Sequence, residues 1–316
     1  METKANSKIG TIKRLIQSKK FKKNIFYFSV VSLPILQFII FYIFVNFRSI
    51  LLAFQDYSYD GGYTFIGFTN FIDFFQKFSI DPKMDYAIKN SFLLYFCNLF
   101  VGTGGAILFS NYIYKKCFGS QIFKITLFLP TIASGIVMVT AYKSIMNIGM
   151  PIIIEKITGE RTLPLLADIE HNFLYVLVFY LWFNFGTQVL MYTSTMSGIS
   201  TEIVESANIE GITPVKELWY ITIPMIYKTL VSFITIGLAG FFTNQMMVFS
   251  FYGIKADAQF YNLGYYLYRQ SQYASTFNDY DIFTEVAAAG LVMSAIAAPL
   301  TIIVRKMLEK YGPSED

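Results

Sequence analysis

Four amide side chains lie within two strongly apolar stretches of the chain, Asn184 and Gln188 in one and Asn244 and Gln245 in the other. A polar side chain is costly in hydrocarbon unless it meets a partner or a water-filled pathway. Asn184 and Gln188 are one helical turn apart and would share one face of a helix. Amides bind hydroxyl groups, so these side chains could line a pathway for a polyhydroxylated solute such as a sugar. The alternative is that they only join neighbouring helices, at roughly 0.6 kcal/mol for each hydrogen bond.

Aromatic side chains near these amides would suit the same kind of solute. Trp182, Tyr192 and Phe241 offer flat apolar surfaces that can pack against the apolar face of a pyranose ring. The predicted substrate-pathway residues are therefore Trp182, Asn184, Gln188, Phe241 and Asn244.

Catalytic and metal-binding chemistry has no comparable support in the sequence. A membrane enzyme would need a constellation of His, Asp or Cys side chains within the apolar segments, and we find none. Cys97 and Cys117 lack the spacing of metal ligands. The only histidine, His171, lies in a polar loop, where an imidazole is usually solvated. We therefore predict no catalytic residue, no metal site and no enzymatic activity for this chain.

The composition requires that these side chains be positioned by membrane-spanning helices. Of the 316 residues, 54% are hydrophobic and only 15% are charged, whereas soluble domains are about a quarter charged. Six apolar segments are long enough to span the hydrocarbon core, so we predict an all-α integral membrane protein. The expected spans are 25–47, 90–113, 122–146, 173–196, 226–249 and 285–304.

The distribution of basic residues predicts the orientation of these spans. Residues 1–23 carry eight Lys or Arg against one acidic residue and are expected to form a basic amphipathic segment. Lys and Arg are also concentrated in the second and fourth loops and directly after the last span, at Arg305, Lys306 and Lys310. Both termini, including the tail 307–316, are therefore expected on the cytoplasmic side. This modest, terminal excess of positive charge favours contact with membrane lipid over binding of nucleic acid. The membrane domain itself is expected over residues 24–306.

A polar loop over 197–224 separates the two amide-bearing segments. Its sequence from residue 205 is ESANIEGITPVKELWYITIP, which is too polar to enter a bilayer. Gly211 can adopt the positive φ that ends a helix, and Pro214 is tolerated in the first turn of the next one. We therefore predict two short helices joined by a sharp turn at the cytoplasmic surface, either as a docking site for a partner or as an ordinary amphipathic connector.

The polar loop resembles the EAA loop of ABC importer permeases, whose pattern is approximately EAA, three residues, Gly, nine residues, Ile, one residue, Leu-Pro. The departures are Ser206 for the first Ala, Glu210 for Asp, Ile212 for Ala and Ile223 for Leu. In that family the loop is a coupling helix that docks in a groove of the ATP-binding subunit. The resemblance assigns this coupling role to Glu205, Ala207, Glu210, Gly211, Leu218, Ile221 and Pro224.

Two further phrases resemble the carbohydrate branch of these permeases, which includes the maltose and glycerol-phosphate systems. They are FIGFTNF at 65–71 and FLP at 128–130. Asn244, within FFTNQ, resembles an asparagine that contacts substrate in sugar importers. The resemblance thus implies the six-helix fold of type I (MetI-like) ABC importer permeases. It also implies that this chain forms half of the translocation pathway for a sugar. An oligosaccharide is favoured over a monosaccharide only because members of this family commonly transport oligosaccharides.

The resemblance also implies an assembly in a bacterial cell membrane. The expected partners are a second homologous permease, two ATP-binding subunits and an extracytoplasmic solute-binding protein, which would be a lipoprotein in a Gram-positive organism. This chain has no GxxxxGK[ST] phosphate loop, so ATP and Mg²⁺ would be bound by the ATP-binding subunits and no cofactor by this chain.

An ion-coupled secondary transporter is the alternative function. Such a carrier would be expected to hold ionisable side chains in the middle of its spans. Lys143 and Glu285 lie near span ends, where their side chains can extend toward water. The sequence therefore favours the ATP-driven importer.

Overall fold

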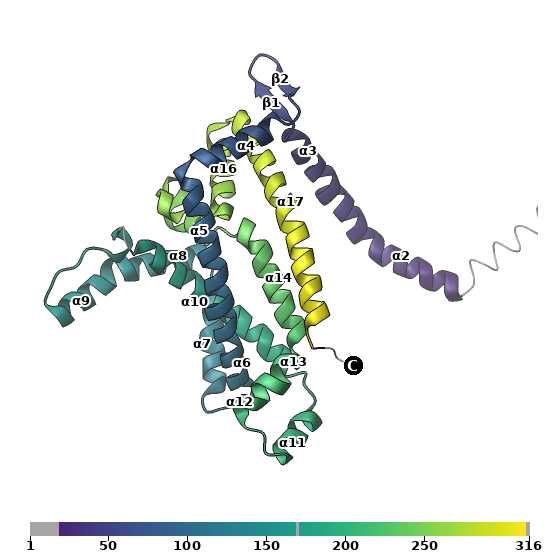
Figure 1. Ribbon diagram of the computed structural model, residues 1–316, viewed down its shortest axis with the longest axis vertical. Helices are drawn as coiled ribbons and strands as arrows, with labels where there is room; N and C mark the ends of the chain where they lie inside the picture. Colours follow the sequence, from purple (N-terminus) through teal and green to yellow (C-terminus); the bar gives the residue numbers. More distant parts are fainter. Residues whose placement is uncertain (1–18, 169–170, 314–316) are drawn as a thin grey trace, which may run out of the picture.

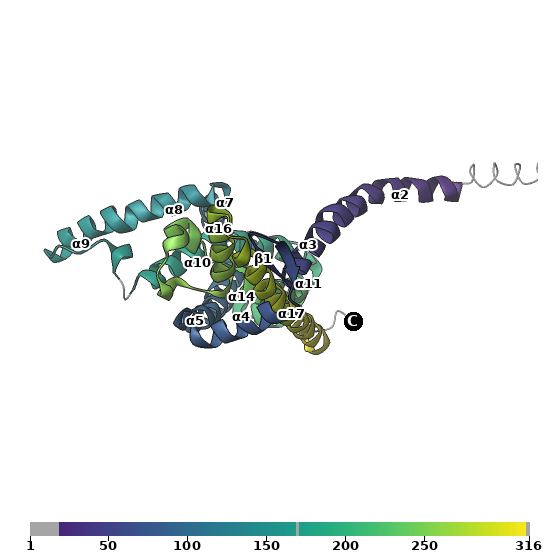
Figure 2. The same ribbon diagram turned by 90° about the horizontal axis from the view of Figure 1, so that it is seen from above.

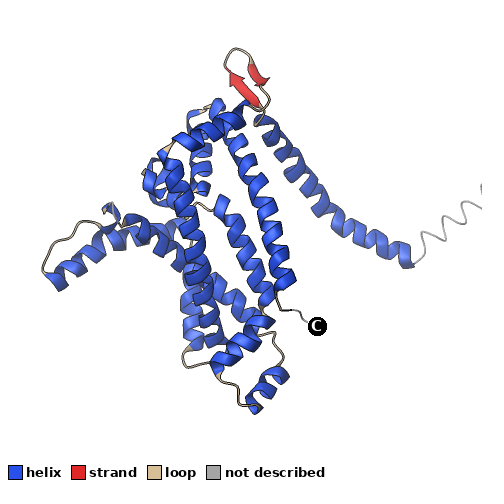
Figure 3. Ribbon diagram, viewed as in Figure 1, coloured by secondary structure: helices blue, strands red, loops and turns tan. Residues whose placement is uncertain are grey.

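The computed structural model describes residues 19–168 and 171–313, and it is helical apart from one small sheet (Figure 1; Figure 3). Among the described residues, five helices are long and apolar enough to cross a membrane, and a bent pair makes a sixth if its two parts count as one span. This confirms the predicted helical membrane protein. Most of the predicted basic segment 1–23, and the end of the predicted tail, lie outside the described residues.

The first span is one long helix that leaves the rest of the molecule. It consists of α2 (Lys19–Phe38), a π-helical stretch (Ile39–Phe44) and α3 (Val45–Leu52). Figure 1 and Figure 2 both show α2 pointing away from the other helices, while α3 packs against the last helix. No residue of the apolar part, Ile25–Leu52, is buried. In a membrane this surface must be covered by lipid or by another protein.

The first outer loop is ordered by a β-hairpin and a helix. These are β1 (Gln55–Ser58), its antiparallel partner β2 (Gly62–Phe65), and α4 (Thr69–Ile80). Asn70 is buried at the start of α4, and its Nδ2 donates hydrogen bonds to Ala53 O at 3.2 Å and Gln55 O at 2.8 Å. This one amide therefore fixes the path of the chain from the first span into the hairpin.

The centre of the molecule is a bundle of long helices. They are α5 (Pro82–Cys97), which continues through a π-helical stretch (Asn98–Thr103) into α6 (Gly104–Tyr114); α10 (Asn172–Met196); α14 (Tyr227–Thr243); and α17 (Tyr280–Tyr311). α10 packs against α6, and α14 packs against α5 and α17. One apolar core surrounds Phe179 and Tyr265, and a second surrounds Tyr192 and Met196. α10 contributes residues to both cores and therefore connects them.

The third span differs from the prediction. The expected helix 122–146 is divided into α7 (Ser120–Ile132) and α8 (Gly135–Ser144) by extended backbone at Ala133 and Ser134. α8 continues through a π-helical stretch (Ile145–Gly149) into α9 (Met150–Thr158), which projects away from the bundle (Figure 2). The reason for the break is tertiary: α7 packs against α10, whereas α8 packs against α15 (Val248–Tyr252).

The fifth span also ends earlier than predicted. α14 stops at Thr243, and Met246 and Met247 then adopt left-handed φ angles of 52° and 58°. Asn244 Oδ1 accepts a hydrogen bond from Met246 N at 2.8 Å, a local bond that competes with continuation of the helix. Gly264, in α16 (Leu263–Phe277), packs so closely that a Cβ there would lie 2.5 Å from Thr243 C. The contact with α16 therefore holds the interruption in place.

Candidate functional site

A cavity of about 570 Å³ lies between α5, α10 and α14, and we call it the central cavity. Its volume is within the usual range of small-molecule sites. It brings together four of the five predicted pathway residues, namely Asn184, Gln188, Phe241 and Asn244. The two amide-bearing segments, which are separated in sequence by the polar loop, therefore meet across one space.

Tyr180 links the amides of the two helices. Asn244 Nδ2 donates a hydrogen bond to Tyr180 Oη, and Asn184 Nδ2 donates to Tyr180 O at 2.9 Å. Tyr180 lines the central cavity but was not among the predicted pathway residues. Its position one helical turn before Asn184 is the signal that could have identified it.

Gln188 lines the central cavity and also joins neighbouring helices. Its Nε2 donates to Asn98 Oδ1 at 3.1 Å, and its Oε1 accepts from Thr103 Oγ1 at 3.5 Å. Asn98 and Thr103 are the ends of the π-helical stretch between α5 and α6, and such stretches are frequent at functional sites. Gln188 thus joins α10 to this stretch while it lines the central cavity. Asn98, which also lines the cavity, is a further residue that sequence reasoning missed.

Trp182 and Tyr192 are placed differently from the prediction. Trp182 does not line the central cavity; its side chain is 45% exposed and its ring lies 6.0 Å from the ring of Phe179. Two residues along an α-helix turn the side chain by about 200°, so Trp182 points away from the face that carries Tyr180. Tyr192 is fully buried in the second apolar core. Of the aromatic side chains first considered, only Phe241 lines the cavity.

The polar loop has the predicted two helices and sharp turn. α11 (Thr201–Ile209) is capped by Ser200, whose Oγ accepts a hydrogen bond from Glu202 N. Gly211 has a φ of +74°, and Pro214 begins α12 (Pro214–Glu217). A π-helical stretch (Leu218–Thr222) and α13 (Ile223–Met225) then lead into α14, which is bent from them by 72°.

The predicted coupling residues divide into an anchored set and an exposed set. Ala207 and Leu218 are buried, and Leu218 belongs to the second apolar core beside α10. Glu205 and Glu210 are exposed, and so is Ile209, whose side chain is 88% exposed. The polar loop is therefore fixed to the bundle on one side, while an acidic and apolar surface faces outward.

A partly buried ion pair ties the polar loop to the end of α6. Glu217 Oε1 pairs with Lys115 Nζ across 102 positions of sequence. The Glu217 side chain is only 4% exposed, whereas that of Lys115 is 28% exposed. This contact was not predicted, because nothing local in either segment indicates it.

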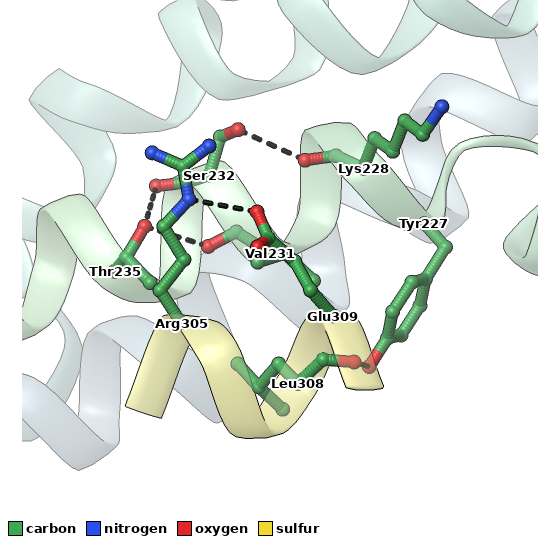
Figure 4. Close-up of polar contacts among 8 residues, drawn as sticks. All are labelled: Tyr227, Lys228, Val231, Ser232, Thr235, Arg305, Leu308 and Glu309. Carbon is green, nitrogen blue, oxygen red and sulfur yellow. Dashed lines mark hydrogen bonds and ion pairs between the residues drawn. The ribbon is translucent and has the colours of Figure 1, made fainter. Parts of the chain in front are cut away.

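A second contact ties the exit of the polar loop to the end of α17 (Figure 4). Tyr227 Oη donates a hydrogen bond to Leu308 O at 3.0 Å. Gly312 leaves room for the Tyr227 ring, since a Cβ there would lie 2.0 Å from it. Figure 4 also shows the exposed Arg305–Glu309 ion pair, with Arg305 Nε and Glu309 Oε1 2.8 Å apart. A movement of the polar loop would therefore displace the end of α6, the start of α14 and the end of α17.

The described residues contain no group of three or more His, Cys, Asp or Glu side chains that could hold a metal ion. Cys97 and Cys117 are free thiols. The central cavity is suited to an uncharged polar solute, since its polar side chains carry amides and hydroxyls.

Comparisons with known proteins agree with this arrangement. A family model described as a binding-protein-dependent transport system inner membrane component matches residues 84–310. The multiple sugar-binding transport system permease protein MsmF of Streptococcus mutans is 21% identical over 279 residues, which cover 87% of this chain and 93% of MsmF. The polygalacturonan/rhamnogalacturonan transport system permease protein YteP of Bacillus subtilis is 24% identical, over 69% of this chain and 67% of YteP.

Solved structures show the same fold. A crystal structure of a bacterial alginate ABC transporter, in complex with an alginate pentasaccharide-bound periplasmic protein, contains a chain that matches with a TM-score of 0.73 and 19% identity. The match covers 92% of this chain and 96% of that one. The predicted fold of ABC importer permeases is thereby confirmed.

Proposed function

The chain belongs to the family of binding-protein-dependent transport system inner membrane components, and from this premise we propose that it forms half of the pathway of an ATP-driven carbohydrate importer. The central cavity carries the proposal, because its amides, hydroxyls and aromatic rings suit a sugar. Relatives named for sugar and polygalacturonan transport support the same substrate class, and they favour an oligosaccharide.

We propose that the first span is covered by a second, homologous permease and by membrane lipid. Its apolar surface is unburied along the whole of Ile25–Leu52, although every other long apolar helix packs partly within the bundle. A second permease would also close the central cavity from the side that this chain leaves open.

The exposed surface of the polar loop is the proposed docking site for an ATP-binding subunit, two of which would serve the two permeases. Glu205, Ile209 and Glu210 would face that subunit, which would bind ATP and Mg²⁺. We place the polar loop and both termini in the cytoplasm. The start of α2 and the end of α17 lie in the half of the molecule nearer to this loop, opposite the β-hairpin (Figure 1). An extracytoplasmic solute-binding protein, a lipoprotein in a Gram-positive organism, would deliver the sugar at the hairpin end.

In this mechanism, ATP-driven movement of the polar loop changes the shape of the central cavity. The Lys115–Glu217 pair would pass the movement to α6, and the Tyr227–Leu308 contact would pass it to α17. α14 begins directly after the loop and lines the cavity with Phe241, and Asn244, which follows its last residue, lines the cavity as well. Binding of nucleotide in the partner would thus alter the access of sugar to the cavity.

An ion-coupled carrier finds no support in the comparisons or in the structure. The two ionisable side chains first considered for it both have partners within this chain. Lys143 Nζ donates to Phe251 O at 2.7 Å, and Glu285 pairs with Lys77 at 2.5 Å.

The proposal predicts that Tyr180→Phe weakens carbohydrate transport. The substitution keeps the ring but removes the hydroxyl that joins Asn244 to α10, so we expect KM to rise about tenfold, the effect of losing roughly one hydrogen bond. Uptake of a panel of radiolabelled oligosaccharides by the importer reconstituted with its partner subunits measures this.

Tyr142→Phe is the matched control for that experiment. Tyr142 also donates one hydrogen bond, to Tyr175 O at 2.9 Å, but it does not line the central cavity. We expect its KM to stay within twofold of the wild-type value.

Uptake of amino acids with no uptake of any oligosaccharide would refute the carbohydrate proposal.

A further inference from the structure

The central cavity has a chemical character that narrows the substrate class. None of the described residues that line it is Asp, Glu, Lys, Arg or His. An ionised carboxylate that enters such a space loses its water and gains no opposite charge from this chain, which is strongly unfavourable. A neutral sugar meets no such penalty, because its hydroxyl groups can exchange water for amides and hydroxyls.

The hydrogen-bonding atoms left free in the central cavity point to the same class. Asn184 uses its Nδ2 to bond Tyr180 O, so its Oδ1 remains an acceptor with no partner among the described residues. Tyr180 Oη accepts from Asn244, so its own proton remains available to donate. A sugar hydroxyl both donates and accepts and can satisfy both atoms. A carboxylate only accepts, and it would be repelled by the Asn184 oxygen.

We infer that this chain passes neutral oligosaccharides and excludes uronate-containing ones. The inference rests on the proposed carbohydrate function and deepens it. It separates this chain from the relative named for polygalacturonan transport and from the alginate transporter of the same fold. Those proteins are only 24% and 19% identical to this chain, so the substrates in their names do not determine which side chains line its cavity.

The test is a binding measurement on matched trisaccharides, using the importer purified with its partner permease and ATP-binding subunits but without the solute-binding protein. Glucose, galactose and mannose trisaccharides are each compared with the corresponding uronate, which differs at the C6 carboxyl group. The methyl ester of each uronate is the third ligand, since it removes the charge and keeps the size. We expect Kd to be at least tenfold lower for the neutral member of one or more pairs, and the ester to regain most of that affinity.

Variants at Asn184 test the atoms invoked. We expect Asn184→Lys, which replaces the free acceptor oxygen with an ammonium group, to improve binding of the uronate at least tenfold. Asn184→Ala should weaken binding of the neutral trisaccharide at least fivefold. Asn46→Ala is the matched control, because Asn46 makes the same bond to a carbonyl four residues earlier, Tyr42 O, on the exposed first span. It should leave both affinities unchanged.

The outcomes separate this inference from the proposed function. Equal or tighter binding of a uronate by the wild type, in any pair that binds, overturns the inference and leaves the carbohydrate function standing. Absence of binding and of uptake for every trisaccharide overturns the carbohydrate function together with the inference.

Discussion

A Lys115→Met substitution is expected to lower carbohydrate uptake by the reconstituted importer at least tenfold, and to do so more severely than Glu217→Gln. Lys115→Met leaves the Glu217 carboxylate, only 4% exposed, buried without its partner. Glu217→Gln leaves the Lys115 ammonium, whose side chain is 28% exposed and can still reach water. Breaking a buried pair costs about 3–5 kcal/mol when one charge is left uncompensated. Uptake and ATPase stimulation by the solute-binding protein, measured on the same preparation, report this loss.

The double variant Lys115→Met/Glu217→Gln removes both charges and should recover most of the lost activity. Arg305→Met/Glu309→Gln is the matched control, since its side chains are 61% and 50% exposed and exposed pairs contribute little. Equal losses for the two single variants, or no recovery in the double variant, would show that the ion pair does not link the polar loop to α6.

Gly186→Ala is expected to destabilise the bundle by separating two packed helices. A Cβ at Gly186 would lie 1.9 Å from Leu127 O and 2.7 Å from Leu127 C, so α7 would have to move away from α10. Backbone atoms cannot rotate aside as a side chain can, and overpacking typically costs about 1–3 kcal/mol or more. We expect a melting temperature lower by several degrees and reduced assembly with the partner subunits, measured by thermal unfolding in detergent and by size-exclusion chromatography.

Gly290→Ala is the control for this prediction, because Gly290 also lies within a long apolar helix and a Cβ there meets no atom within 4 Å. Its melting temperature should stay the same or rise slightly, since Ala favours helix over Gly. If both alanine variants melted alike, the close approach of α7 and α10 would not be a determinant of the fold.

The polar loop was predictable from sequence because its shape is set locally. Gly211 supplies the positive φ, Pro214 begins the second helix, and both act through their own backbone preferences. Its attachment to the bundle was not predictable. Lys115 and Glu217 are 102 positions apart, and only the folded bundle brings them together.

The spans were predictable as apolar segments, but their interruptions were not. Hydrophobicity alone predicts a helix through residues 133–134 and through 244–247, whereas the structure breaks both. The second break depends on Gly264, which comes from another helix. The lining of the central cavity was also only partly predictable. The amides were identified by their polarity, but the rotation of each helix about its axis decides which aromatic side chains face the cavity.

The attachment of an ATP-binding subunit to the polar loop is the central claim, and co-purification tests it most directly. The tagged chain is purified from its native membrane as wild type, as Ile209→Asp and as Phe118→Asp. Ile209 and Phe118 are both highly exposed apolar residues, at 88% and 96%, but Phe118 lies between α6 and α7, outside the polar loop. We predict that wild type and Phe118→Asp bring down a sister permease and an ATPase, whereas Ile209→Asp retains the permease and loses the ATPase. Purification of the wild type without any ATPase, or full retention of the ATPase by Ile209→Asp, would contradict the coupling role of this loop.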